Sequence, residues 1–137
     1  MSHEYIQLSF DKVVQTRVYT AIVLQSPLKR FAIFSEAITG RFLQMHLGDQ
    51  ERERPFTHDL LSHIFNALDI RVKQVVITDI QDTIFYSRLF LEMEKDGLRH
   101  IIEIDSRPSD SIILAFLHNA PVFCANHVLE KAVSFVE

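Results

Sequence analysis

The chain has 137 residues, of which 47% are hydrophobic, and a formal net charge of −4. A chain of this length buries roughly 68% of the surface that its unfolded form exposes, which is enough for one core. With a single cysteine, Cys124, the chain cannot form an internal disulfide. The sequence does not begin with the basic residues and apolar run of a secretory signal peptide, and no apolar run approaches the ~20 residues that cross a bilayer. We therefore expect one cytoplasmic domain over residues 1–137 with no membrane partner, and any nucleic-acid site must be a local basic patch because the net charge gives no global attraction.

The first half of the chain predicts three strands and two helices. Period-two alternation and β-branched residues predict strands over residues 5–10, 13–25 and 30–35. Helical spacing predicts a helix over 37–47, although Gly40 costs it about 1 kcal/mol relative to Ala. After a charged loop, Thr57 is expected to cap a second helix. Its predicted buried stripe consists of Leu60, Leu61, Ile64, Phe65 and Leu68.

The second half repeats this pattern. Three strands separated by hairpin turns are predicted over residues 71–80, 83–94 and 98–105. Pro108 suits the first position of another helix, and a short strand over 121–124 precedes a final helix capped by Asn126. That last helix is predicted to bury Val128, Leu129, Ala132 and Val136. We therefore expect an α+β fold of antiparallel strand meanders packed with helices, and the pattern suggests a duplicated three-strand-plus-helix unit.

The first candidate site lies at the start of the helix near residue 57. Arg54 and His58 flank a helix entry, where exposed N–H groups and the helix dipole favour an anion such as phosphate. Asp59 and His63 lie four residues apart and share a helical face, a spacing that can place two ligands on one metal. The alternative is that Asp59 merely complements the dipole and His63 is solvated.

The second candidate site runs from a strand end into a helix start at residues 103–111 (EIDSRPSDS). With Pro108 at the first helical position, Asp110 falls at the third, where it can return a hydrogen bond to the capping residue. The cap position is then Arg107, where Ser, Thr, Asp or Asn is preferred, so local propensity does not explain the arginine. Asp105 and Asp110 could hold a metal and a phosphate around Arg107, or the three could form a structural ion-pair network.

Three stretches together resemble the bifunctional nuclease family: residues 54–61 (RPFTHDLL), 75–79 (VVITD) with 85–89 (FYSRL), and 103–111. The resemblance covers roughly residues 13–133, and the Thr-His-Asp and Pro-Ser-Asp elements fall in the family's order and spacing. It implies an α+β fold that tends to self-associate, and therefore a homo-oligomer. It also implies nuclease activity, which a plant member carries on both RNA and DNA.

Our leading hypothesis is therefore a metal-dependent nuclease, a phosphodiesterase acting on RNA or single-stranded DNA. Asp59, Asp105 and Asp110 would hold Mg²⁺ or Mn²⁺, which activates water and stabilises developing charge. Asp105 and Asp110 would form the catalytic centre, with His58 as the candidate general acid or base. The candidate phosphate-binding residues are Arg54, Arg107 and Ser109.

The chain departs from the family where the third strand meets the following helix. The family usually has Ile-Gly-x-x-Glu-Ala there, and an ungapped alignment puts Glu36 at the glycine, Thr39 at the glutamate and Gly40 at the alanine. If that glutamate is catalytic, the chain either lacks the activity or uses Glu36 from a shifted position. The rival hypothesis is a non-catalytic binding or oligomeric assembly module, in which the acidic turns only stabilise the fold.

Overall fold

The computed structural model of the chain describes residues 4–48 and 51–136. Within those residues, four helices pack against a seven-stranded sheet that is antiparallel in all but one of its strand pairs, as the predicted α+β class requires. The strands are β1 (Tyr5–Gln15), β2 (Tyr19–Gln25), β3 (Arg30–Glu36), β4 (Arg71–Gln81), β5 (Ile84–Lys95), β6 (Leu98–Ser106) and β7 (Val122–Ala125). The helices are α1 (Ala37–Leu47), α2 (Thr57–Ala67), α3 (Pro108–His118) and α4 (Asn126–Lys131).

The sheet consists of two antiparallel meanders joined by a strand from the end of the chain. Its order is β3-β2-β1-β7-β4-β5-β6. β7 pairs antiparallel with β1, where Val122 lies opposite Leu8, and parallel with β4, where Val122 lies opposite Val75. A strand of only four residues therefore ties the two halves of the chain into one sheet.

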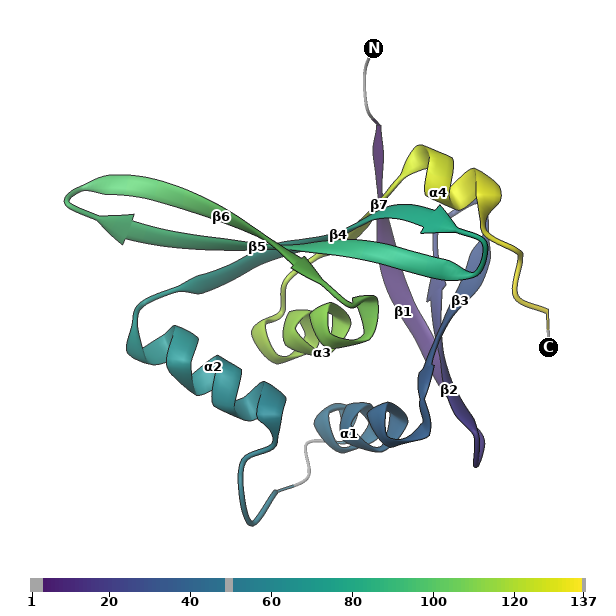
Figure 1. Cartoon of the computed structure of the whole chain (residues 1–137), viewed down its shortest axis with the longest axis horizontal. Coiled ribbons are helices and arrows are strands. Elements are labelled where there is room, and N and C mark those ends of the chain that lie inside the picture. Colours follow the sequence, from purple (N-terminus) through teal and green to yellow (C-terminus); the bar gives the residue numbers. More distant parts are fainter. Residues whose placement is uncertain (1–3, 49–50, 137) are drawn as a thin grey trace.

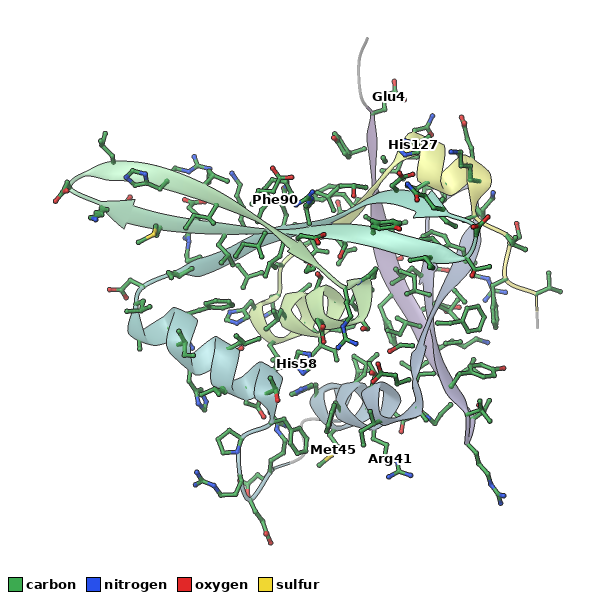
Figure 2. The ribbon with its side chains drawn as sticks, in the orientation of Figure 1. Glu4, Arg41, Met45, His58, Phe90 and His127 are labelled. Carbon is green, nitrogen blue, oxygen red and sulfur yellow. The ribbon has the colours of Figure 1, made fainter. Side chains whose placement is uncertain are left out.

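The helices are divided between two sides of the central strands. In Figure 1, α1, α2 and α3 lie together below β4 and β5, whereas α4 lies above β4 near the C-terminal end. The main core runs between them and includes the fully buried Ile77, Ile113 and Val128. Figure 2 shows His58 pointing from α2 toward the space between α1 and α3, whereas Arg41 points away from the molecule.

Each meander anchors the helix that follows it through a hydroxyl on its middle strand. Thr20 of β2 donates to the backbone oxygen of Glu36 at 2.9 Å and accepts the Gly40 N–H at 3.0 Å. Ser87 of β5 donates to the backbone oxygen of Ser106 at 2.6 Å and contacts the hydroxyl of Ser111 at 3.2 Å. The two halves thus use the same device to fix the first turns of α1 and α3, which agrees with the suggested repeat of a three-strand-plus-helix unit.

Several sequence predictions about element boundaries and burial were wrong. β1 continues through Gln15, and the chain turns at residues 16–18 because the Thr16 hydroxyl accepts the N–H groups of Val18 and Tyr19. In α2, Phe65 is buried as predicted, but the other predicted stripe residues Leu60, Ile64 and Leu68 are exposed, because the helix buries His58 and Asp59 instead.

The third error concerns the C-terminus. The final helix ends at Lys131, so Val136 is 83% exposed instead of buried, although Val128 and Leu129 are buried as predicted. The helix start assigned to Thr57 is displaced by one residue, since Phe56 occupies the cap position.

Among the described residues, no helix combines the length and apolar character needed to cross a membrane.

Candidate functional site

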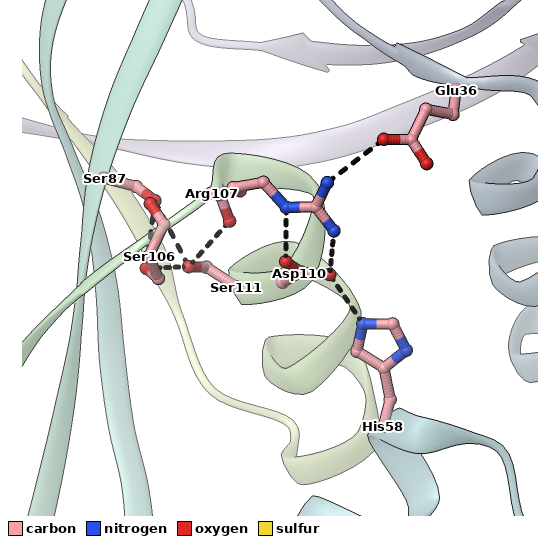
Figure 3. A network of polar contacts seen from close by, with 7 residues as sticks. All are labelled: Glu36, His58, Ser87, Ser106, Arg107, Asp110 and Ser111. Carbon is pink, nitrogen blue, oxygen red and sulfur yellow. Dashed lines mark hydrogen bonds and ion pairs between the residues drawn. The ribbon is translucent and has the colours of Figure 1, made fainter.

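The N-termini of three helices meet at one place, shown in Figure 3. Glu36 caps α1, Arg107 caps α3, and His58 lies in the first turn of α2. Neither Glu36 nor Arg107 makes the side-chain hydrogen bond that a capping residue normally makes to its own helix. Their side chains instead bond to each other, Arg107 also bonds to Asp110, and Asp110 contacts His58. The site is therefore built from residues 36, 58 and 107–110 of the chain.

Arg107 is the centre of this cluster. Its Nε donates to Asp110 Oδ2 at 2.8 Å and its Nη2 to Asp110 Oδ1 at 3.3 Å, while its Nη1 donates to Glu36 Oε1 at 3.1 Å. The hydrogen bonds and charge of Asp110 raise the pKa of Arg107 above its ordinary value. The Arg107 side chain is still 63% exposed, so one face of the guanidinium remains open to solvent. This pairing explains why an arginine occupies the cap position.

Asp110 links the arginine to a buried histidine. His58 Nε2 lies 3.0 Å from Asp110 Oδ1. The hydrogen bond from His58 and then those from Arg107 outweigh desolvation and lower the pKa of Asp110 to about 2. Asp110 is therefore ionised at neutral pH, and an ionised carboxylate favours the His58 tautomer that carries its proton on Nε2.

The other nitrogen of His58, Nδ1, is buried and has no hydrogen-bond partner among the described residues. His46 of α1 lies beside it, with ring centroids 6.4 Å apart, and both of its ring nitrogens are likewise buried and unpartnered in the described part of the chain. Burial, followed by the charge of Arg52, lowers the pKa of His46. The two imidazoles thus lie edge to face, with three ring nitrogens that are shielded from solvent.

A serine network holds α3 in the orientation that presents Arg107. The hydroxyls of Ser87, Ser106 and Ser111 contact one another, and Ser111 donates to the backbone oxygen of Arg107 at 3.2 Å. Ser87 and Ser111 are fully buried, so these bonds are shielded from water. The strand end of β6 and the first turn of α3 are therefore locked together, which limits the positions open to the arginine.

Asp59, one position after His58, belongs to a separate pair. Arg52 Nε donates to Asp59 Oδ2 at 2.6 Å, and a second Arg52 nitrogen bonds the other oxygen. Asp59 also accepts the Phe56 N–H at 2.8 Å, and these contacts, those of Arg52 first, lower its pKa. This pair closes the start of α2, where Asp59 accepts the N–H of the capping residue, a structural role beyond the dipole complement that the sequence offered as the alternative for it.

The structure brings some predicted site residues together and separates others. His58, Arg107 and Asp110 share one cluster, and Ser109 is buried in the first turn of α3 beside it. Asp105 is exposed on β6, opposite Arg88 of β5. Arg54 is exposed in the loop before α2. His63, the proposed partner of Asp59, is also exposed, on the outer face of α2.

The three aspartates proposed as metal ligands do not form a metal centre in this arrangement. Asp59 and Asp110 each accept hydrogen bonds from a different arginine, and Asp105 lies on an exposed strand. Across residues 4–48 and 51–136, no group of three or more His, Cys, Asp or Glu side chains is placed to hold a metal ion. The described residues therefore do not fit a Mg²⁺ or Mn²⁺ ion bound by these side chains alone.

Sequence reasoning missed His46 and Arg52, and it did not predict the contact between Glu36 and Arg107. One sequence signal pointed to that contact: both helices begin after a residue that is a poor cap for its own helix. His46 and Arg52 carry no comparable signal, because the residues that they contact, His58 and Asp59, lie on another element at no regular spacing.

The comparison with known protein families identifies the family of the chain. The family model of the bifunctional nuclease domain matches residues 10–137. The chain belongs to the bifunctional nuclease domain family. Two proteins of Mycobacterium tuberculosis, "Uncharacterized protein MT1877" of strain CDC 1551 / Oshkosh and "Uncharacterized protein Rv1829" of strain ATCC 25618 / H37Rv, are each 28% identical to it over 130 residues. Each alignment covers 86% of this chain and 75% of the relative. This bifunctional nuclease domain carries the three-helix cluster within the matched residues.

Proposed function

We propose that this bifunctional nuclease domain hydrolyses phosphodiester bonds in RNA or single-stranded DNA at the cluster of Glu36, Arg107, Asp110 and His58. The observation that carries the proposal is the convergence of three helix N-termini on an exposed arginine, in a chain that belongs to a nuclease family. Helix N-termini favour anions through their free N–H groups and the helix dipole, and a guanidinium matches two phosphate oxygens. A phosphodiester is the anion that the family points to.

Arg107 would bind the scissile phosphate with its open face and stabilise the charge that develops on the phosphate oxygens. Asp110 and His58 act as positioning residues in this scheme. The two hydrogen bonds from Arg107 to Asp110 fix the plane of the guanidinium, and the contact with the buried His58 fixes Asp110 in turn.

Glu36 would be the general base. It is 66% exposed, and its contact with Arg107 is made through Oε1, so the second oxygen can accept a proton from a water molecule beside the bound phosphate. That water then attacks phosphorus as the bond to the leaving oxygen breaks, and the leaving oxygen takes up a proton from solvent. This role corresponds to the shifted glutamate that the family comparison of the sequence suggested. The acid-base role predicted for His58 stays a prediction, and its buried Nδ1 favours positioning.

Divalent metal dependence also stays a prediction from the sequence. Because the described aspartates are not close enough together to hold a metal ion, no step of the scheme passes through a metal. The homo-oligomeric state and a cytoplasmic location are likewise predictions at this point.

The experiment is cleavage of labelled RNA and single-stranded DNA by wild type, Glu36→Gln and Asp105→Asn, each with Mg²⁺, Mn²⁺ or excess EDTA. Loss of general base catalysis predicts that Glu36→Gln lowers the cleavage rate by roughly 10²-fold or more. Asp105→Asn is expected to retain activity if the cluster acts alone. Loss of activity in Asp105→Asn and in EDTA would instead assign catalysis to a metal at the position the sequence suggested.

A second candidate function is a non-catalytic binding module, and a specific observation favours it. Arg107 already pairs with two carboxylates, so the ion-paired cluster has a formal charge of −1 when His58 is neutral. A phosphate would have to compete with Glu36 and Asp110 for the guanidinium. Absence of cleavage by the wild-type protein under every metal condition would select the binding module.

A further inference from the structure

An exposed aromatic pair, Tyr19 and Phe34, lies on β2 and β3. Their ring centroids are 5.4 Å apart in a T-shaped contact. Tyr19 is 40% exposed and Phe34 is 62% exposed. The chain has eleven Phe, all of them in the described residues, and Phe34 is the only one that is neither buried nor half-buried. The aromatic pair therefore contributes little to the core, and packing alone does not explain why two rings stand at this surface.

The strand register places both rings on the same face of the sheet as Glu36. Tyr19 lies directly opposite Glu36 in the β2–β3 pairing, and the Cβ atoms of such a cross-strand pair are about 5 Å apart on one face. Phe34 precedes Glu36 by two residues, so it faces the same way at a distance of roughly 6.6 Å along the strand. Glu36 itself contacts Arg107 at 3.1 Å. The aromatic pair is thus adjacent to the residues that would hold the phosphate and activate water.

The surface is hollowed next to Phe34. A cavity of about 470 Å³ opens between β3, the β4–β5 turn and the C-terminal segment, and its walls are mainly apolar. This volume is within the range of small-molecule sites. The apolar residues that line the cavity with Phe34 include Ile80, Phe85, Val133 and Phe135. A flat apolar group beside the cluster therefore has room against the ring of Phe34.

We propose that Tyr19 and Phe34 bind a nucleobase of the substrate next to the scissile phosphate and so select single-stranded nucleic acid. A nucleobase is the flat group that a phosphodiester substrate carries, and every base can stack on an exposed aromatic side chain. A base within a duplex is already stacked between its neighbours, so it reaches the aromatic pair only after it leaves the helix. The proposal rests on the proposed function for the position of the phosphate, and it adds the residues that determine strand specificity.

The test compares two probes of equal length and charge: a fluorescein-labelled oligodeoxythymidylate, and the same backbone with tetrahydrofuran abasic residues throughout. Both probes offer the same phosphates, so the ratio of their dissociation constants, measured by fluorescence anisotropy, isolates the contribution of the bases. Binding is measured in the Glu36→Gln chain, which keeps the aromatic pair and Arg107 and cleaves the probe slowly. It should bind the oligothymidylate at least about fivefold more tightly than the abasic probe, since stacking of one base contributes roughly 5- to 150-fold. Adding Tyr19→Leu and Phe34→Leu should abolish this preference.

The matched control is Tyr86→Leu, which removes a ring of the same 40% exposure from β5, where Tyr86 lies opposite Asp79. It should keep the preference for bases. The proposal is overturned if the Glu36→Gln chain shows no preference, or if the preference survives the double leucine substitution in a chain that is folded by circular dichroism. A surviving preference together with a changed oligomeric state would assign the aromatic pair to a subunit contact instead.

Cleavage of the oligothymidylate by the wild type separates this proposal from the proposed function. If the wild type does not cleave but the double leucine substitution abolishes the preference for bases, the base site stands and the nuclease activity is refuted. If the wild type cleaves and the preference survives the substitution, the base site alone is refuted.

Discussion

Replacing Asp110 by Asn removes the carboxylate charge from the centre of the cluster and keeps the size of the side chain. The pKa of Asp110 falls from 3.8 to about 2 in the folded protein, with the His58 hydrogen bond as the largest cause. A difference of that size corresponds to about 2.4 kcal/mol. Since the Asp110 side chain is 33% exposed, solvent screening reduces this to roughly 1–2 kcal/mol.

The pH dependence of this contribution has a definite sign. Because the folded pKa lies below the unfolded value, the stabilisation is complete above about pH 5 and is lost as the pH falls toward 2, with about half gone by pH 3. Asp110→Asn cannot be protonated at this position. The difference in free energy of unfolding between wild type and variant should therefore be largest at neutral pH and shrink in acid.

Urea denaturation of both proteins at pH 7, 5, 4 and 3 measures that difference directly. We expect roughly 1–2 kcal/mol at pH 7 and about half as much at pH 3. A difference that stays constant from pH 7 to pH 3 would refute the electrostatic reasoning and leave only a packing effect. A double-mutant cycle with His58→Gln then isolates the contribution of the histidine.

Two further predictions concern the packing around the cluster. Gly40→Ala should lower the free energy of unfolding, measured in urea, by about 1–2 kcal/mol, although Ala has the better helix propensity. The reason is that the added methyl group would overlap the Gln15 side chain, which is anchored by hydrogen bonds to Thr16, Thr20 and Ala37. An unchanged or raised stability would show that Gln15 can move aside. His46→Leu should raise the melting temperature at pH 6 and reduce the loss of stability below about pH 6.5. The reason is that the lowered pKa of His46 means that the folded state resists protonation of this side chain. An equal loss of stability in acid for wild type and His46→Leu would contradict this.

Much of the fold follows from local pattern. Alternation and turn residues predicted β4, β5 and β6 to within one or two residues, and α1 has the predicted bounds. The place of β7 between β1 and β4 could not be predicted, because a strand of four residues carries no signal for which neighbours it joins. The exposed stripe of Leu60, Ile64 and Leu68 shows the limit of periodicity: α2 has apolar residues on two faces, and tertiary contacts of His58 and Asp59 decide which one is buried.

The sequence predicted the local contacts of the candidate site but not its long-range contacts. Arg107 and Asp110 are three residues apart, so their interaction belongs to local sequence, and the unsuitable cap marked it. The contacts with Glu36 and His58 span 71 and 52 residues, and no spacing rule relates such positions. Asp105 is close in sequence to this cluster yet lies exposed on β6, which a list of neighbouring acidic residues could not reveal.

The most direct test of the central claim is the cleavage rate of a labelled single-stranded RNA by wild type and Arg107→Ala, with Arg88→Ala as the matched control. Arg88 is a partly exposed arginine on β5 whose ion pair with Glu103, at 3.8 Å, lies outside the cluster. We expect Arg107→Ala to lose at least about 10²-fold in rate and Arg88→Ala to keep that of wild type. Equal rates for wild type and Arg107→Ala, with both proteins folded, would contradict the assignment of this cluster as the phosphodiesterase site.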